Sequence, residues 1–415
     1  MSDFLQLVLV LAILISATKV AGLLSTRMGQ PAVLGELLVG LLLGPSLLNV
    51  VHLPFFTSSH LDTTIHELAE FGVIFLMFIA GLEIEVDELR KSGKVASFAG
   101  VLGVLVPLGL GWGLGALFGY DTQHALFIGV LMTATSVSIS AQTLMELGVL
   151  RSRVGVALLG AAVLDDVLVI LVLSVFLAIV GGDGGAISIV WTFVRMVLFL
   201  GGTLLIGRRL IPWLAQRVAR WPISQPVVTL AVVVALLFAW MAEVLGGVAA
   251  ITGAFLVGVL FARTPQRGQI ERGIQGLAYG FLVPIFFASI GLQTDARALD
   301  GSMVLFTVLA CLVAVISKVV GCGLGARLGG FPARESLQLG VGMISRGEVG
   351  LIVASVGISA GLIGQDIFAM TVIIVLVTTL VTPLLLRAVF GRAASPSSKQ
   401  PPRSEGADTP VPAAE

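Results

Sequence analysis

The chain has 415 residues, of which 57% are hydrophobic and only 12% are charged, and its mean hydropathy is +1.06. Soluble domains carry about 25% charged residues, so this composition excludes a water-soluble globular protein and indicates a polytopic membrane protein. The 24 basic and 24 acidic residues cancel, and this balance gives no indication of a nucleic-acid partner.

Apolar segments long enough to cross a bilayer follow one another along almost the whole chain. A helix needs roughly 17 to 25 mainly apolar residues to span the hydrocarbon core. We therefore expect about thirteen transmembrane helices, near residues 4–24, 33–50, 68–82, 95–118, 124–147, 155–180, 188–207, 225–245, 247–263, 273–293, 302–325, 335–360 and 366–387. Only Gly246 and Gly247 separate two of these segments, so twelve spans are the alternative count. The expected fold class is an all-α polytopic membrane domain over residues 1–391.

Positive charge is distributed unevenly between the two sets of loops. With the N-terminus outside, thirteen spans place nineteen of the 24 Lys and Arg residues in the inner loops and the tail, as expected for cytoplasmic loops. This asymmetry predicts an outer N-terminus and a cytoplasmic C-terminus, and the cell inner membrane is the expected location. Residues 392–415 are rich in Pro and Ser and have no apolar period, so we expect a disordered cytoplasmic tail.

Five ionisable residues interrupt the apolar spans. The sixth span contains Asp165 and Asp166 side by side, the eleventh contains Lys318, and the twelfth contains Arg346 and Glu348. Each such charge near the bilayer centre costs about 2.5 to 3.5 kcal/mol, and such residues usually mark an ion path or a proton relay. Pairing or hydration therefore has to remove most of this cost.

A salt-bridge network that only holds helices together is the alternative interpretation of these charges. For Arg346 and Glu348 the two interpretations stay equally open. The two aspartates favour a functional site, because Lys318 can neutralise only one of them and side chains one position apart on a helix point about 100° apart. The second carboxylate suits a reversible site for a proton or a small cation, since the bound ion offsets the buried charge.

Two of the spans are expected to be discontinuous helices. The fifth carries Thr, Ser or Gln at seven positions within residues 131–145, and the twelfth is interrupted by Gly340, Gly342, Gly347 and Gly350. A hydroxyl-rich packing face is the alternative for the fifth span alone. Hydroxyl and freed carbonyl oxygens suit an alkali cation, and broken helices in corresponding positions of two halves indicate a transporter site. Spans five and twelve are seven apart, which predicts inverted-topology repeats whose two broken helices cross at the midplane.

Four motifs of the chain, and the order in which they follow one another, resemble the monovalent cation:proton antiporter superfamily. The resemblance is to the NapA/GerN-like branch of this superfamily, which consists of bacterial Na⁺/H⁺ antiporters. The four motifs are ATSVSISAQTLMELGVL, LGAAVLDDVLVILVL, SKVVGCGLGA and GMISRGEVGLIVA, and the strings GQPAVLGELLVGLLLGP and FLVPIFFASIGL resemble patterns of the second and tenth spans. The likeness covers residues 1 to 390. It implies a homodimer in which a core bundle, roughly residues 68–180 and 302–391, moves like an elevator relative to dimerisation and linker spans.

The resemblance also implies roles for the aspartates, the lysine and two hydroxyl residues. Asp166 matches the aspartate that binds the cation or the proton, and Asp165 matches the neighbour that pairs with Lys318. Thr135 and Ser136 match positions in the unwound segment that supply oxygens to Na⁺ beside Asp166. Two aspartates with a lysine resemble the electrogenic members of the superfamily, which exchange two protons for one Na⁺.

We also expect roles for three further residues. Arg346 and Glu348 match a motif near the second break, where the resemblance implies a structural or gating role. Glu146 is expected to cap the inner end of the fifth span. A Kef-like potassium efflux system is the alternative within the superfamily, although such systems commonly add a nucleotide-binding domain, for which the sequence gives no indication.

The expected function is secondary active exchange of Na⁺, or of K⁺ or Li⁺, for H⁺ by alternating access, without a cofactor and without enzymatic activity. An intramembrane protease is disfavoured, because His66 is followed by ELAE rather than by the zinc-binding H-E-x-x-H pattern. A channel is disfavoured because no TVGYG-like filter is visible. The expected partners are monovalent cations, protons, membrane lipid and a second copy of the chain.

Overall fold

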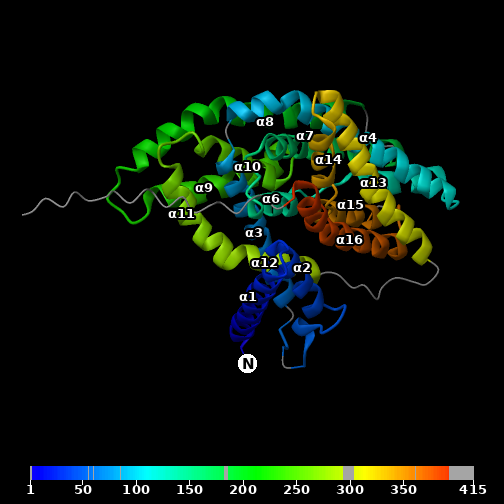
Figure 1. Ribbon diagram of the computed structural model, residues 1–415, viewed down its shortest axis with the longest axis horizontal. Coiled ribbons are helices and arrows are strands. Elements are labelled where there is room, and N and C mark those ends of the chain that lie inside the picture. Colours follow the sequence, from blue (N-terminus) through cyan, green and yellow to red (C-terminus); the bar gives the residue numbers. More distant parts are fainter. Residues whose placement is uncertain are drawn as a thin grey trace, which may run out of the picture.

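Every regular element is a helix in the part of the chain that the structure, a computed structural model, describes: residues 2–54, 56–58, 60–84, 86–181, 186–292, 303–359 and 361–391 (Figure 1). The helices are α1 (Asp3–Arg27), α2 (Ala32–Leu43), η1 (Val50–His52), α3 (Leu61–Glu83), α4 (Val86–Leu117), α5 (Thr122–Thr133), α6 (Val137–Glu146), α7 (Arg153–Gly181), α8 (Ala186–Val218), α9 (Pro226–Met241), η2 (Ala242–Gly246), α10 (Ala250–Phe261), α11 (Arg267–Leu277), η3 (Ala278–Leu282), α12 (Val283–Leu292), α13 (Val304–Gly329), α14 (Ala333–Gly342), α15 (Glu348–Ser359) and α16 (Gln365–Phe390). The all-α fold class is thus confirmed.

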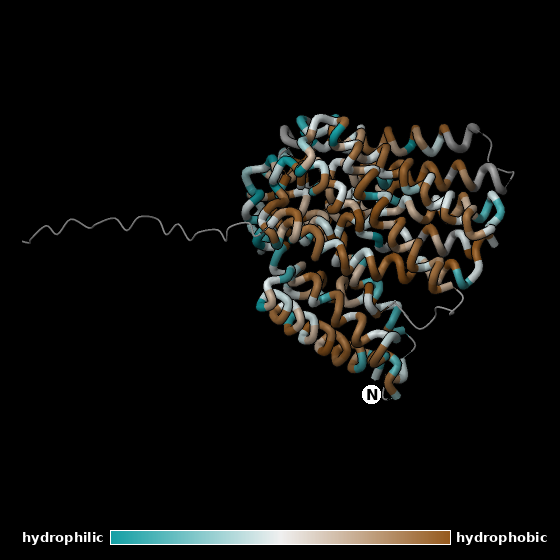
Figure 2. Tube along the Cα trace, turned by 45° about the vertical axis from the view of Figure 1, so that its right-hand side comes forward, coloured by the Kyte–Doolittle hydropathy of each residue, from teal (hydrophilic) through white to brown (hydrophobic). Residues whose placement is uncertain are grey.

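The helices have the lengths and compositions of membrane spans. Ten helical segments of the described residues are long and apolar enough to cross a bilayer, and α2 and α10 are shorter apolar helices. Figure 2 shows apolar stretches along most helices, with hydrophilic residues gathered towards their ends. The chain is therefore a multi-pass membrane protein, while the count of thirteen spans stays a prediction.

Both segments predicted to be discontinuous are interrupted. Residues 134–136 separate α5 from α6, and residues 343–347 separate α14 from α15; we call these segments the first break and the second break. Hydroxyl-rich and glycine-rich sequences permit such interruptions, because side-chain oxygens and neighbouring helices can bond to backbone groups that lose their helical partners. The crossing of the two helices at the membrane midplane stays a prediction.

Contacts between the helices divide most of them into two groups. The α4 group consists of α4, α5, α7, α13, α14, α15 and α16, and the α3 group consists of α1, α2, α3, α9, α10 and α12. Helix α6 contacts members of both groups, namely α7 and α16 on one side and α2 and α3 on the other. The assignment of residues 68–180 and 302–391 to a moving core stays a prediction.

Glycines allow α4 and α13 to pack with their backbones in close contact. A Cβ atom on Gly321 would lie 2.5 Å from the carbonyl oxygen of Leu102, and one on Gly325 would lie 2.3 Å from that of Phe98. Small residues four positions apart are the usual means of close packing between membrane helices. Lys318 lies one turn before Gly321 on α13, so this packing also fixes the depth and direction of the lysine.

Replacing Gly325 with Ala is expected to destabilise the protein, because the new methyl group meets backbone atoms that cannot move away without separating α4 from α13. Overpacking of this kind costs about 1 to 3 kcal/mol. Gly109→Ala on α4 is the matched control, because a Cβ atom there meets nothing within 4 Å. Thermal unfolding in detergent measures both variants, and a Gly325→Ala protein as stable as the control would contradict the packing.

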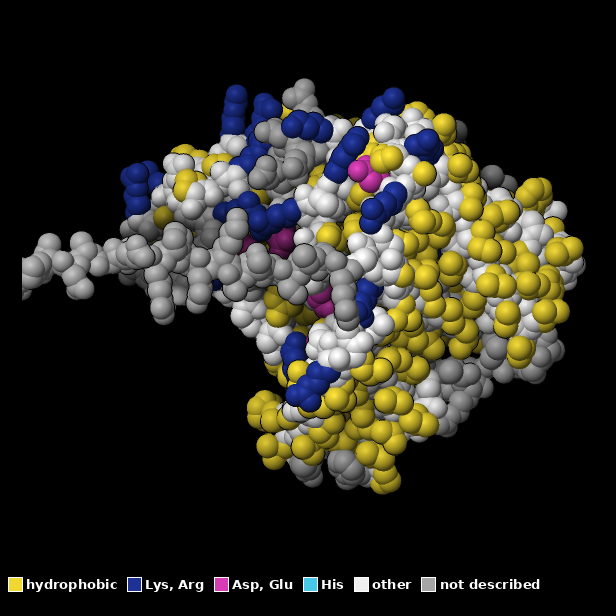
Figure 3. All heavy atoms as spheres, viewed as in Figure 1, with side chains coloured by type: hydrophobic (Ala, Val, Ile, Leu, Met, Phe, Trp, Pro, Cys, Tyr) yellow, Lys and Arg dark blue, Asp and Glu magenta, His cyan; other side chains and the backbone are white. Residues whose placement is uncertain are grey.

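The surface carries large apolar areas together with a region of positive charge. Only 17% of the most apolar window of α8 and 22% of that of α1 are buried, as expected for helices that face lipid or another subunit. Figure 3 shows Lys and Arg side chains gathered on the upper and left parts of one face, with hydrophobic side chains over its right and lower parts. The sidedness of the chain stays a prediction, and the tail at 392–415 lies outside the described residues.

Candidate ion-binding site

The two breaks lie against each other and satisfy each other's backbone groups. The backbone N–H of Ser136 in the first break donates to the carbonyl oxygen of Ser345 in the second break at 2.8 Å. The Ser345 hydroxyl donates back to the carbonyl oxygen of Ser136. The Ser140 hydroxyl on α6 donates to the carbonyl oxygen of Gly342 at the end of α14 at 2.5 Å. Irregular backbone within an apolar layer requires such partners, and the hydroxyl-rich sequence of α6 supplies them.

Arg346 connects the second break to three neighbouring segments. Its guanidinium donates to the carbonyl oxygen of Ala134, at the end of α5, and to that of Ala314 on α13 at 3.2 Å. Its backbone N–H donates to the Thr378 hydroxyl at 3.1 Å, and its carbonyl oxygen accepts from the Thr379 hydroxyl at 2.8 Å. A cation is favourable at a helix C-terminus, so Arg346 stabilises the end that the first break leaves on α5.

Of the two twelfth-span charges, Arg346 is buried among backbone carbonyl groups. Arg346 is 2% exposed, and the contacts described for its guanidinium go to carbonyl oxygens rather than to a carboxylate. The side chain of Glu348 lies outside the described residues. A bracing function for Arg346 agrees with these contacts, and a gating function for either residue stays a prediction.

Asp165 and Lys318 form a buried ion pair. The Nζ atom of Lys318 lies 2.7 Å from Oδ1 of Asp165, and both residues are fully buried. Helix α4 covers the pair at Gly103, where a Cβ atom would lie 3.6 Å from the same carboxyl oxygen and 2.5 Å from Sγ of Cys322. The pairing implied by the resemblance is therefore present, and it joins α7 to α13 within the α4 group.

Asp166, on α7 of the α4 group, forms a hydrogen bond to a helix of the α3 group. Its Oδ2 atom accepts a hydrogen bond of 3.0 Å from the hydroxyl of Thr252, the third residue of α10. Asp166 is 7% exposed and Thr252 is 3% exposed. Sequence reasoning missed Thr252, which looks like a single hydroxyl in an apolar segment, because the pairing of helices across the bundle cannot be derived from the periodicity of either helix.

Thr135 and Ser136 lie in the first break, as expected, and both are buried. The Thr135 hydroxyl lies 3.4 Å from the carbonyl oxygen of Thr133, and the hydroxyls of Ser136 and Ser138 lie 3.0 Å apart. The two breaks thus concentrate hydroxyl and carbonyl oxygens, which are the ligands that alkali cations prefer. A cation site shared by these oxygens and Asp166 stays a prediction.

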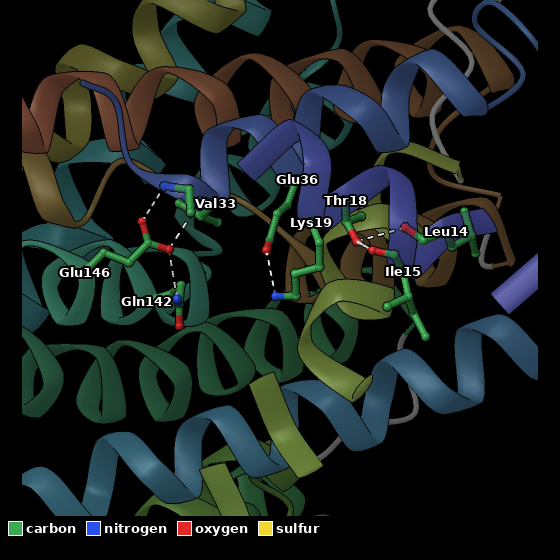
Figure 4. Close-up of polar contacts among 9 residues, drawn as sticks. Leu14, Ile15, Thr18, Lys19, Val33, Glu36, Gln142 and Glu146 are labelled. Carbon is green, nitrogen blue, oxygen red and sulfur yellow. Dashed lines mark hydrogen bonds and ion pairs between the residues drawn. The ribbon is translucent and has the colours of Figure 1, made fainter. Parts of the chain in front are cut away.

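A second polar contact joins α6 to the start of α2 (Figure 4). The carboxylate of Glu146 accepts from the backbone N–H groups of Ala32 at 2.6 Å and Val33 at 3.2 Å, and the Gln142 amide donates to it at 2.9 Å. The expectation that Glu146 caps its own span is wrong, because the end of α6 is closed by the backbone N–H of Leu147 bonding to Thr143. Glu146 instead supplies the N-terminal acceptor that α2 lacks after Pro31.

One turn further along α2, an ion pair holds this helix to α1. The Nζ atom of Lys19 lies 3.2 Å from Oε1 of Glu36, and the carboxyl side chain is 7% exposed whereas the lysine side chain is 47% exposed. Figure 4 shows the two contacts following each other along α2. The start of α2 is therefore held by side chains of two other helices, Lys19 of α1 and Glu146 of α6.

Comparison with known proteins decides the family. The family described as "Sodium/hydrogen exchanger, transmembrane" matches residues 10–391. The chain belongs to this family. That range contains all the residues of the two breaks, the Asp165–Lys318 pair and the Asp166–Thr252 contact.

Proteins named as Na⁺/H⁺ antiporters resemble the chain over nearly its whole length. The chain is 38% identical over 381 residues to the Na⁺/H⁺-K⁺ antiporter GerN of Bacillus cereus, covering 92% of this chain and 95% of the relative. It is 34% identical to a Na⁺/H⁺ antiporter of Enterococcus hirae, covering 91% and 96%. The solved structure of the sodium proton antiporter MjNhaP1 from Methanocaldococcus jannaschii matches with a TM-score of 0.68 at 17% identity, covering 94% and 98%, which shows a shared fold.

Proposed function

We propose that this chain is a secondary antiporter that exchanges Na⁺ for H⁺ across a membrane by alternating access. The observation that carries the proposal is the arrangement around Asp166. This buried carboxylate follows directly after one that is already neutralised by Lys318 at 2.7 Å, and both lie on a helix of the group that contains the two breaks. Membership of the sodium/hydrogen exchanger family supports the same activity.

Competition for one carboxylate accounts for the coupling. Deprotonated Asp166 binds Na⁺ together with oxygens of the first break, in particular those of Thr135 and Ser136, and protonated Asp166 releases it. An uncompensated charge is costly within the apolar layer. The loaded protein therefore changes its access state readily, and the protein with an ionised, empty site does not.

The finer points of the proposal follow from the same residues. Lys318 alternates between pairing with Asp165 and giving up its proton, so two protons move for one Na⁺ and the exchange is electrogenic. The α4 group moves relative to the α3 group, in a homodimer of the cell inner membrane with the N-terminus outside. The Kef-like alternative is not favoured, because the curated relatives described above are named as Na⁺/H⁺ antiporters or, for GerN, as a Na⁺/H⁺-K⁺ antiporter.

Proteoliposomes test this function directly. With an acidic interior and a neutral exterior, the purified protein is expected to take up radioactive Na⁺ in a saturable manner, and a protonophore that collapses the pH gradient is expected to stop the uptake. Electrogenic exchange moves net positive charge outwards and opposes itself, so clamping the potential with K⁺ and valinomycin is expected to accelerate uptake. The same assay with K⁺ and Li⁺ ranks the cations.

Two results would contradict the proposal at different levels. Na⁺ uptake that ignores the pH gradient would exclude coupled exchange. Coupled uptake that is unaffected by clamping the potential would retain the antiporter but exclude the stoichiometry of two protons for one Na⁺.

A further inference from the structure

Helix α10 begins beside the carboxylate of Asp166. It has 12 residues, which at about 1.5 Å per residue span roughly 18 Å, well short of the ~30 Å hydrocarbon core. The π-helical element η2 and Gly247, whose φ is 64°, separate it from α9. This interruption turns the chain so that the first turn of α10, which carries Thr252, faces α7.

The contact between Thr252 and Asp166 connects the two groups of helices at the level of the site. Thr252 belongs to α10 in the α3 group, and Asp166 belongs to α7 in the α4 group. Charged groups close to this contact include the Asp165–Lys318 pair, on α7 and α13, and Arg346 of the second break, which interacts electrostatically with Asp165. Arg195 on α8 lies beside Gly247, before the start of α10. Thr252 is neutral, so it can change the preference of Asp166 between Na⁺ and H⁺ without adding a charge to the site.

We propose that Thr252 is a positioning residue that favours Na⁺ over H⁺ at Asp166 in the access state seen here; the inference rests on the proposed function. A hydroxyl that donates to a carboxylate stabilises the ionised form, which is the form that binds Na⁺. The same oxygen keeps lone pairs that can coordinate the ion. Both effects disappear when the oxygen is removed.

The preference is specific to one access state, because the two partners belong to different groups of helices. A hydrogen bond of 3.0 Å does not survive a relative displacement of more than about 1 Å. Movement of the α4 group relative to the α3 group therefore removes Thr252 from Asp166 and lowers the affinity for Na⁺ on the other side of the membrane. The contact thus helps to load the ion on one side and release it on the other.

Thr252→Val, which keeps the shape but removes the hydroxyl, tests the inference with two matched variants. Thr252→Ser keeps the hydroxyl. Thr264→Val removes a buried hydroxyl from just beyond the other end of α10, where the described hydrogen bond of this hydroxyl goes to the Phe261 carbonyl oxygen. The readouts are the Na⁺ concentration that gives half-maximal thermal stabilisation in detergent, and the KM for Na⁺ and the pH profile of exchange in proteoliposomes.

The expected result is a rise of about ten- to a hundredfold in the half-stabilising Na⁺ concentration and in KM for Thr252→Val, with a pH profile moved to more alkaline values. Thr252→Ser and Thr264→Val are expected to behave like the wild type. Unchanged values for Thr252→Val, or tighter Na⁺ binding, would overturn the role of Thr252 while leaving the antiporter intact. A wild-type protein that Na⁺ neither stabilises nor drives into exchange would overturn both proposals.

Discussion

Replacing Asp166 with Asn is expected to abolish coupled Na⁺/H⁺ exchange while leaving the fold intact. The amide has nearly the same shape and can still accept from Thr252, but it carries neither a charge for Na⁺ nor a titratable proton. Two unit charges about 4 Å apart attract each other by roughly 4 kcal/mol at an effective dielectric constant near 20. Loss of that attraction corresponds to Na⁺ binding that is weaker by about a thousandfold. Uptake of radioactive Na⁺ driven by a pH step measures the effect.

The control for Asp166→Asn is the same change at an exposed carboxylate. Asp62 is 60% exposed and lies 3.2 Å from His52, away from the breaks, so Asp62→Asn is expected to transport like the wild type. Thermal unfolding verifies that each protein is folded before transport is compared. Saturable exchange driven by the pH step in Asp166→Asn proteoliposomes would remove this residue from the mechanism.

Lys318→Met is expected to be strongly destabilising, and adding Asp165→Asn is expected to restore most of the loss. The single variant leaves the carboxylate of Asp165 buried without its cation, and breaking a buried pair in this way costs about 3 to 5 kcal/mol. The double variant replaces the charged pair by a neutral one. Thermal unfolding of the wild type, both single variants and the double variant gives the coupling energy of the pair.

Transport by the double variant distinguishes the contribution of the ion pair to stability from the contribution of the lysine proton to exchange. It keeps Asp166 but lacks the lysine proton, so its Na⁺ uptake is expected to lose its sensitivity to valinomycin and K⁺. Arg151→Met is the stability control, because its partner Glu83 lies 3.6 Å away and the arginine side chain is 58% exposed, a setting worth about 0 to 1 kcal/mol. A Lys318→Met protein no less stable than this control would show that the pair contributes nothing to stability.

That Lys318 pairs with one of the two aspartates could be predicted from the sequence because the membrane leaves few alternatives, whereas the choice of Asp165 came only from the family resemblance. A lysine and an aspartate in apolar spans each cost several kcal/mol unless they are paired, and Lys318 and Asp165 meet at 2.7 Å accordingly. The breaks were predictable for a similar reason, since Ser, Thr and Gly gather where backbone groups need other partners or close approach. The free-energy cost of an unpaired charge or backbone group within an apolar span is large, so its presence can be predicted from which residues stand in the span and where.

The contacts of Thr252, Glu146 and Arg346 could not be predicted in the same way. Each depends on which helix lies beside which, and neither helical periodicity nor hydropathy specifies that arrangement. Thr252 looks like one hydroxyl in an apolar helix, and Glu146 looks like a helix-end carboxylate. Arg346 looked equally suited to a salt bridge, whereas its described contacts are carbonyl oxygens at the ends and sides of other helices.

The carboxylate of Glu146 makes the start of α2 dependent on a different helix. The N–H groups of Ala32 and Val33 have no acceptor within α2, and they bond to a side chain of α6. If α6 withdraws, both N–H groups lose this acceptor, and the buried N–H of Val33 must then bond to water, because an unpaired donor is costly in an apolar environment. Glu146 is itself exposed, so the contact lies at the protein surface, and separation of α2 from α6 would let water enter from there towards Val33.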